Sequence, residues 1–174
     1  MFRPIRPKKI KVPKREKSRL FLDINNYTKK SFNHQGILET PASFMSFFNG
    51  AIQEVYSDLL RPFKQKKYDK IKETKAKEQK QEIKIKAKNN YERLCDFKKK
   101  LVYLLDKIKK LISELRQYLI NQRKDLNQNE IKEIEEEIKE WEFVADNVLS
   151  TFINFITNTI EKFIAPKIKK IDGE

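Results

Sequence analysis

The stretch 64–122 contains neither proline nor glycine. These two residues are the strongest breakers of a helix, so their absence over this length favours one long helix, or two segments with a break. The whole chain of 174 residues has only 3 glycines and 6 prolines, too few for the many turns of an all-β fold. We therefore predict an all-α fold class, with a helix over 64–122.

The second half of this stretch carries a coiled-coil-like seam. Its apolar residues recur at alternating spacings of three and four, the pattern that places them on one face of a helix. They are Leu94, Phe97, Leu101, Leu104, Ile108, Leu111, Leu115 and Tyr118. Further apolar residues broaden this face, namely Val102, Leu105, Ile112 and Leu119. The first part, 64–81, is mostly Lys, Glu and Gln, which predicts a solvated or frayed helix.

A second helix is predicted over 130–165, after a turn at 121–129 in which Asn127 or Asn129 supplies the N-cap. We expect Pro166 to end it and residues 167–174 to be a polar tail. Its apolar positions again step by three and four. They are Ile131, Ile134, Ile138, Trp141, Ala145, Val148, Phe152 and Phe155.

A third helix is predicted over 40–63. Thr40 is a good N-cap, and Pro41 at the first helical position loses no hydrogen bond. We expect Pro62 to end or kink this helix. Its phenylalanine-rich face suits it to cover the other two helices. The predicted architecture of 40–174 is thus a helical domain in which this Phe-rich helix packs on a long antiparallel helical hairpin.

Charge segregation supports the antiparallel pairing. Residues 61–110 have 19 basic and 7 acidic side chains, a net charge of +12, whereas 125–146 have 2 basic and 9 acidic ones, a net charge of −7. Folding the chain back near position 125 brings the two charges together. Because exposed ion pairs are worth only about 0–1 kcal/mol each, this pattern selects orientation more than it adds stability.

Residues 1–39 are predicted to be an extended basic arm. Pro4, Pro7 and Pro13 oppose a helix, and four of the eight arginines lie in 1–19. Residues 20–24 are a short strand or an apolar anchor. We predict that the arm contacts nucleic acid, with docking on a protein or a solubilising tail as alternatives. The contact residues would be Arg3, Arg6, Lys8, Lys9, Lys11, Lys14, Arg15, Lys17 and Arg19. The basic stretch 64–88 is a second candidate, although its mixed charges favour a solvated helix.

No catalytic, cofactor-binding or metal-ligating residues are predicted. A single cysteine, Cys95, and a single histidine, His34, exclude an internal disulfide and any Cys/His metal cluster. No phosphate-binding glycine loop is present. No secretory signal follows the basic start, and prolines oppose the amphipathic helix of a transit peptide. The apolar face of 141–165 is interrupted by charges, so we expect no transmembrane span.

These features predict a non-enzymatic structural or assembly component of a large nucleic-acid-containing complex, such as a phage or viral virion or a ribonucleoprotein. Its partners would be nucleic acid, bound through 1–19, and other protein subunits, with a homo-oligomer possible and a membrane unexpected. The expected location is intracellular or within a virus particle, without secretion. In general organisation, a basic Arg/Pro-rich arm beside a helical body resembles small proteins of ribosomes and virus particles. The alternatives are a coiled-coil adaptor or chaperone and a peripheral membrane-surface protein.

Overall fold

The computed structural model describes residues 38–173, and every element in this range is helical, which confirms the all-α class. The helices join into three rods. The first rod comprises α3 (Pro41–Val55), the π-helical η2 (Tyr56–Leu60) and α4 (Arg61–Lys64). The second is α5 (Lys77–Gln122). The third comprises α6 (Gln128–Phe143), the π-helical η5 (Val144–Leu149), α7 (Ser150–Thr159), the π-helical η6 (Ile160–Ile164) and α8 (Ala165–Asp172). Two 3₁₀ helices, η3 (Lys67–Lys72) and η4 (Arg123–Asp125), connect the rods.

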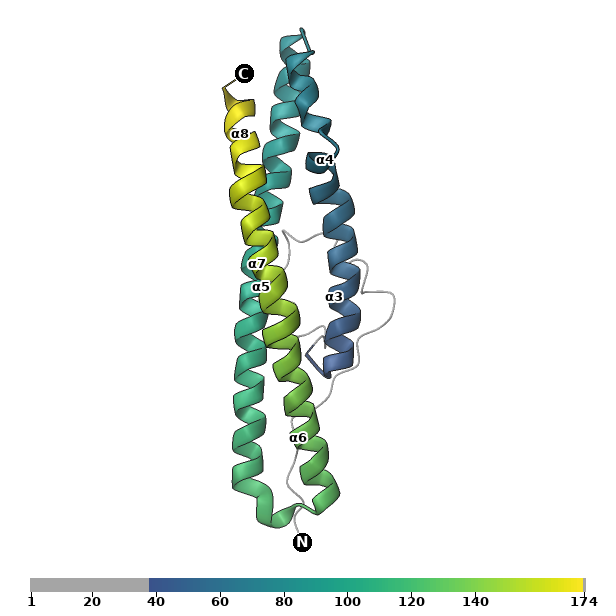
Figure 1. Ribbon diagram of the computed structural model, residues 1–174, viewed down its shortest axis with the longest axis vertical. Coiled ribbons are helices and arrows are strands. Elements are labelled where there is room, and N and C mark those ends of the chain that lie inside the picture. Colours follow the sequence, from purple (N-terminus) through teal and green to yellow (C-terminus); the bar gives the residue numbers. More distant parts are fainter. Residues whose placement is uncertain (1–37, 174) are drawn as a thin grey trace.

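The three rods lie side by side along the long axis (Figure 1). The first rod runs alongside the part of the molecule that contains α7, and α5 runs back antiparallel to it. Among the described elements, α5 and α6 alone continue beyond the start of α3, and η4 joins them at the far end (Figure 1). No helix among residues 38–173 is both long enough and apolar enough to cross a membrane.

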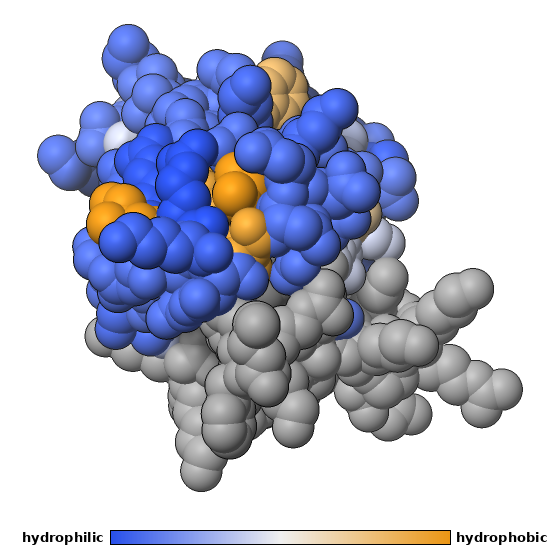
Figure 2. All heavy atoms as spheres, turned by 90° about the horizontal axis from the view of Figure 1, so that it is seen from below, coloured by the Kyte–Doolittle hydropathy of each residue, from blue (hydrophilic) through white to orange (hydrophobic). Residues whose placement is uncertain are grey.

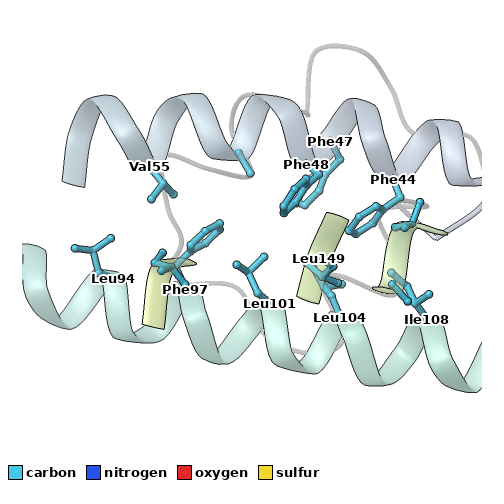
Figure 3. Close-up of a cluster of buried hydrophobic side chains, with 14 of the residues drawn as sticks. Phe44, Phe47, Phe48, Val55, Leu94, Phe97, Leu101, Leu104, Ile108 and Leu149 are labelled. Atoms are coloured by element: carbon cyan, nitrogen blue, oxygen red, sulfur yellow. The ribbon is translucent and has the colours of Figure 1, made fainter. Parts of the chain in front are cut away.

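The core lies between α3, α5 and α7. Phe44, Phe47 and Phe48 of α3 point toward the leucines of α5 (Figure 3). The Phe48 ring also meets the ring of Phe152 on α7 edge-on, with 5.4 Å between centroids. Trp141 of α6 is fully buried, with its ring centroid 6.2 Å from that of Phe44. Aromatic side chains thus tie the first rod to the other two.

The predicted cap at Thr40 is confirmed, and of the two candidates Asn127 and Asn129 the structure uses Asn127, so that α6 begins at Gln128 and not at 130. The Oγ1 atom of Thr40 accepts a hydrogen bond from the backbone N–H of Ser43 at 3.0 Å, and Pro41 occupies the first turn. At the start of α6, the Oδ1 atom of Asn127 accepts one from the N–H of Glu130 at 2.8 Å. Each cap satisfies an N–H group that the helix itself leaves without an acceptor.

The three π-helical segments coincide with a distinctive burial pattern. Buried positions advance by four residues repeatedly at Ala51–Val55–Leu59–Phe63, at Trp141–Ala145–Leu149 and at Ile156–Ile160–Ile164–Ile168. In an α-helix each such step overshoots a full turn by about 40°, so a run of them would rotate away from the core. The i→i+5 hydrogen bonds of a π turn accommodate the extra residue and keep the buried stripe facing α5.

The same segments explain why the prolines do not end their helices. Pro62 follows η2 and Pro166 follows η6, and each lies in the first turn of the α-helical segment that comes next. A proline inside an α-helix clashes with the carbonyl four residues earlier. The wider π turn before each proline relieves that clash. Our prediction that the last helix ends at Pro166 is therefore wrong, since the helix continues to Asp172.

The predicted polar tail is consequently part of the fold. Ile168 and Ile171 are buried in α8. Lys167 donates a hydrogen bond from Nζ to the backbone oxygen of Phe63 at 3.0 Å, and its Nζ lies 4.5 Å from the centroid of the Phe163 ring. This lysine fastens the end of the third rod to the end of the first.

The helix predicted to start at residue 64 starts later. Lys66 adopts a left-handed backbone with φ of 57°, which turns the chain away from α4, and α5 begins at Lys77. Between α4 and α5, the short helix η3 packs on the core through two buried side chains, Tyr68 and Ile71. Of the two alternatives predicted for 64–122, one long helix or two segments with a break, the structure shows the second, with the break between η3 and α5.

The predicted seam residues fall into two groups. Ten are buried, namely Leu94, Phe97, Leu101, Leu104, Ile108, Leu115, Ile131, Ile134, Ile138 and Trp141, as is Ala145. Leu111, Tyr118, Val148 and Phe152 are half-buried, and Phe155 is 47% exposed. On the third rod the extra residue in η5 shifts the stripe by one position, so Leu149 and Ile156 are buried in place of Val148 and Phe155. On α5, Ile112 and Leu119 are buried in place of Leu111 and Tyr118, because a straight α-helix drifts about 20° per heptad.

Candidate nucleic-acid interface

The nine predicted contact residues of the basic arm, from Arg3 to Arg19, lie outside the described residues, as does the whole predicted arm up to residue 37. A candidate interface must therefore be sought on the helical body. The charged residues of the body are distributed unevenly between its two ends.

The start of α5, the end of α8 and η3 lie at the same end of the molecule (Figure 1), and each of these segments contains lysines. We call residues 67–88 together with 165–172 the basic end. It contains 12 lysines and 5 acidic residues, so its net charge is 12 − 5 = +7. Although its two parts are far apart in sequence, ion pairs and side-chain contacts join them.

The contacts across the basic end fix the relative positions of its lysines. Lys88 of α5 pairs with Asp172 of α8 at 2.7 Å between Nζ and Oδ1. The Nζ atom of Lys167 lies 4.0 Å from a carboxylate oxygen of Asp69 in η3. A small pocket of about 90 Å³ lies between η3 and α8, and Lys72, Lys167 and Lys170 contribute to its wall.

Tyr68 anchors η3 to the two rods beside it. Its ring lies 4.9 Å from that of Phe63, measured between centroids, and its hydroxyl oxygen accepts a hydrogen bond from the side-chain amide of Asn90 on α5. Burial raises the pKa of the Tyr68 hydroxyl, and the Asn90 hydrogen bond opposes that shift. The tyrosine thus stays neutral and holds η3 against α5, so that the lysines of η3 remain at the surface.

The opposite end of the molecule carries the opposite charge. Helix α6 has seven glutamates and two lysines, a net charge of −5. Two arginines of the second rod and η4 pair with it, Arg116 with Glu142 and Arg123 with Glu135. Figure 2 shows this end from below, where the described surface is mainly hydrophilic with a few apolar residues. Helix α5 alone is about 69 Å long at 1.5 Å per residue, so the two charges are well separated.

The exposed lysines of the basic end can neutralise anionic groups at its surface. Lysines bind phosphate as point charges, without the bidentate geometry that arginine offers. Within the described range no group of three or more His, Cys, Asp or Glu side chains could hold a metal ion. Electrostatic interaction with the neighbouring Cys95 raises the pKa of the Tyr91 hydroxyl.

Sequence reasoning finds only part of the basic end. Composition identifies the stretch 64–88 as basic, but its mixed charges favour a solvated helix. The lysines at 167, 169 and 170 fall in the predicted polar tail. The neighbouring Ile168 and Ile171, however, have the three-residue spacing of a helix face. That spacing is the signal that could have placed these lysines on a packed helix.

Comparisons with protein-family models, with curated proteins and with solved structures found no match to this chain.

Proposed function

We propose that this chain is a non-enzymatic structural or assembly component of a nucleic-acid-containing complex, such as a virus particle or a ribonucleoprotein. The observation that carries the proposal is the convergence of lysines from η3, α5 and α8 at one end of a charge-separated molecule. In this proposal the basic end contacts the phosphate backbone, and the predicted arm of residues 1–19 adds further contacts.

Binding of this kind follows from counterion release. Each phosphate that a lysine neutralises frees condensed cations, so the logarithm of the binding constant falls with the logarithm of salt concentration by about 0.9 per phosphate on duplex DNA. Because the basic end contains lysine but no arginine, we propose that it recognises the backbone without reading base sequence.

We further propose that the α5–α6 pair acts as a coiled-coil-like hairpin spacer. Its net negative end is repelled by phosphate, which would orient the molecule with the basic end toward nucleic acid and the η4 end away from it. The far end would then be free to meet other protein subunits of the complex.

A charge-neutralisation experiment tests the basic end directly. We expect the triple substitution Lys70→Gln, Lys77→Gln and Lys169→Gln to weaken binding to random-sequence duplex DNA and single-stranded RNA, and to reduce the salt slope by about 2–3. The matched control replaces three exposed lysines nearer the other end, Lys109, Lys110 and Lys124, by Gln. Fluorescence anisotropy at several salt concentrations measures both. Equal losses in the two triple variants would show that net charge alone, not the basic end, drives binding.

Deletion of residues 1–19 separates the contribution of the arm. If the arm contacts phosphate, its removal lowers the salt slope further, in addition to the effect of the triple substitution. An unchanged slope after deletion would remove the arm from the proposal and leave the basic end alone.

A coiled-coil adaptor or chaperone is the second candidate function, and one observation favours it: α3 and α7 have exposed faces without charge. An adaptor would hold its protein partner through nuclease treatment and at high salt. Co-purification that survives both treatments would favour the adaptor, and loss of all partners on nuclease treatment would favour the nucleic-acid complex.

A further inference from the structure

Two segments of this highly charged chain, 40–53 and 147–160, contain no charged residue at all. Charged residues make up 37% of the chain, so a segment of either length would ordinarily contain several. Burial explains why the core positions of these segments are apolar. It does not explain why their exposed polar positions also lack charged side chains. These include Asn49 and Gln53 on α3 and Asn147, Thr151 and Asn154 on the third rod.

The two uncharged segments lie against each other. The ring contact between Phe48 and Phe152 joins them, and α3 and α6 also pack together through Phe44 and Trp141. Near the start of α3 a groove of about 410 Å³ lies between the rods, with Met45 on one wall and Phe143 and Val144 on the other.

Each segment has a second apolar stripe beside the one that enters the core. On the first rod it is Ala42, Met45, Asn49, Ile52 and Tyr56, and on the third it is Val148, Thr151 and Phe155, which follow Phe143. The steps are three and four, apart from the five residues between Phe143 and Val148 that span the π-helical η5, and this spacing places each stripe on one side of its helix. Phe143, Phe155 and Tyr56 are 57%, 47% and 41% exposed. We call these nine residues the uncharged face.

Depletion of charge together with enrichment of aromatic side chains is the compositional mark of a protein–protein interface. None of the nine residues of this face supplies a cation for phosphate. A protein with a net charge of +14 also repels a second copy of itself, except where a surface without charge allows close approach. The composition of the uncharged face therefore fits a second copy of the chain.

We propose that two copies associate through the uncharged face, antiparallel about a two-fold axis that passes near Asn49 and Val148. A two-fold interface requires a self-complementary surface. In this arrangement α3 and the third rod of each copy form four packed helices, a common helix-bundle solution for burying apolar stripes.

The charges at the rims of the face select the antiparallel orientation. At one end α6 presents Glu136 and Glu140, with Lys139 between them, and at the other Arg61 and Lys64 lie beside the Tyr56 ring. Arg61 lies as far beyond Asn49 in the sequence as Glu136 lies before Val148. Both separations correspond to about 18 Å along a helix, so an antiparallel two-fold axis brings the acidic rim of one copy to the basic rim of the other.

Sedimentation equilibrium of the nuclease-treated full chain, over about 1–100 µM, tests the dimer independently of nucleic-acid binding. We expect a monomer–dimer equilibrium in which Thr151→Lys raises the dissociation constant at least tenfold, because two new cations meet near the axis. The control Asn154→Lys places the same charge on the same helix, outside the stripe, and should dimerise like the unmodified chain. Circular dichroism checks that both exposed substitutions leave the fold intact.

A charge exchange tests the identity and orientation of the partner. Glu136→Lys should weaken the dimer, and adding Arg61→Glu in the same chain should restore it, because these positions meet only between antiparallel copies. A chain that stays monomeric up to 100 µM, or that is indifferent to Thr151→Lys, would overturn the proposal. If Arg61→Glu fails to restore the dimer, the antiparallel arrangement is wrong.

Discussion

The α5–α6 pair near η4 and the three-rod body share the same long helix, α5, but they are held together differently. In the pair, buried residues of α6 step by three, four and three, and no π turn interrupts the helix. Ion pairs such as that between Arg116 and Glu142 link the two helices at their exposed edges. In the body, aromatic rings fill the core, and η2, η5 and η6 interrupt the first and third rods.

The difference shows what each kind of contact requires of a helix. Alternating steps of three and four keep a narrow stripe on a single partner, which suits two helices. In the body, the first and third rods bury successive positions four apart, whereas α5 keeps steps of three and four. A regular α-helix cannot hold such a run on one side, so π turns absorb the surplus residues.

Deleting one residue from each region gives the largest expected effect. Asp106 lies on the exposed side of the regular helix α5, and Asp146 lies on the exposed side of η5. Deleting Asp106 rotates everything after it by about 100° and moves Ile108, Leu115 and the other buried residues of the pair off the core. We expect the cooperative unfolding of the α5–α6 pair to be lost, as measured by circular dichroism and hydrogen exchange.

Deletion of Asp146 is the matched control, because it also removes one exposed aspartate from a helix. It should convert the π turn into an α turn and leave the flanking register unchanged, at a cost of about 1 kcal/mol or less, within the usual range for a tolerated change. If the two deletions destabilise the protein equally, then η5 does not hold a surplus residue and the comparison fails.

The sequence predicts what depends on local rules. The caps at Thr40 and Asn127 and the buried stripe of α6 are predicted correctly because neighbouring residues determine them. The predicted stripe is wrong beyond η5, where Phe155 was expected to pack and Ile156 is buried instead. A π turn depends on how a rod meets two others, and spacing within a single segment does not contain that information.

The candidate site divides in the same way. The basic character of 64–88 follows directly from composition. The contribution of Lys167 and its neighbours does not, because the usual effect of a proline such as Pro166 is to end a helix. The third rod continues past this proline after the π-helical η6, and its last helix, α8, lies beside η3. The basic end therefore depends on a tertiary feature that no local rule reveals.

Truncating a core side chain in each region should reveal a smaller difference, measured as the loss in the free energy of unfolding. Phe48→Ala removes a buried ring that contacts the rings of Phe44 and Phe152, and we expect a loss of about 3–5 kcal/mol. Leu119→Ala acts where, within 38–173, α5 packs on α6 alone, and its side chain is already 7% exposed, so about 2 kcal/mol is expected. Urea unfolding measures both values. A larger loss for Leu119→Ala would mean that the pair, not the body, dominates stability.

The smallest expected effect concerns a carboxylate of the body. Burial, with a smaller contribution from the negative charge of Asp58, raises the pKa of Glu54 from 4.5 to about 7. Its Oε2 atom is buried without a hydrogen-bond partner among the described residues. Between these two pH values the folded protein binds more protons than the unfolded chain, so the free energy of unfolding falls as pH rises from about 4.5 to about 7. After allowance for solvent screening, we expect a loss of about 1 kcal/mol.

Glu54→Gln removes this titration and should raise the melting temperature at pH 8 relative to the unmodified chain. At pH 4, where Glu54 is protonated in the folded state, the two proteins should melt within error of each other, because a neutral carboxyl and an amide impose the same desolvation. Asp58→Asn should produce part of the gain at pH 8, since it removes the secondary cause of the shift. A gain of equal size at pH 4 and pH 8 would assign the effect of Glu54→Gln to packing. In that case the ionised Glu54 carboxylate would not destabilise the body, and it would not differ in this respect from the exposed, ion-paired carboxylates of α6.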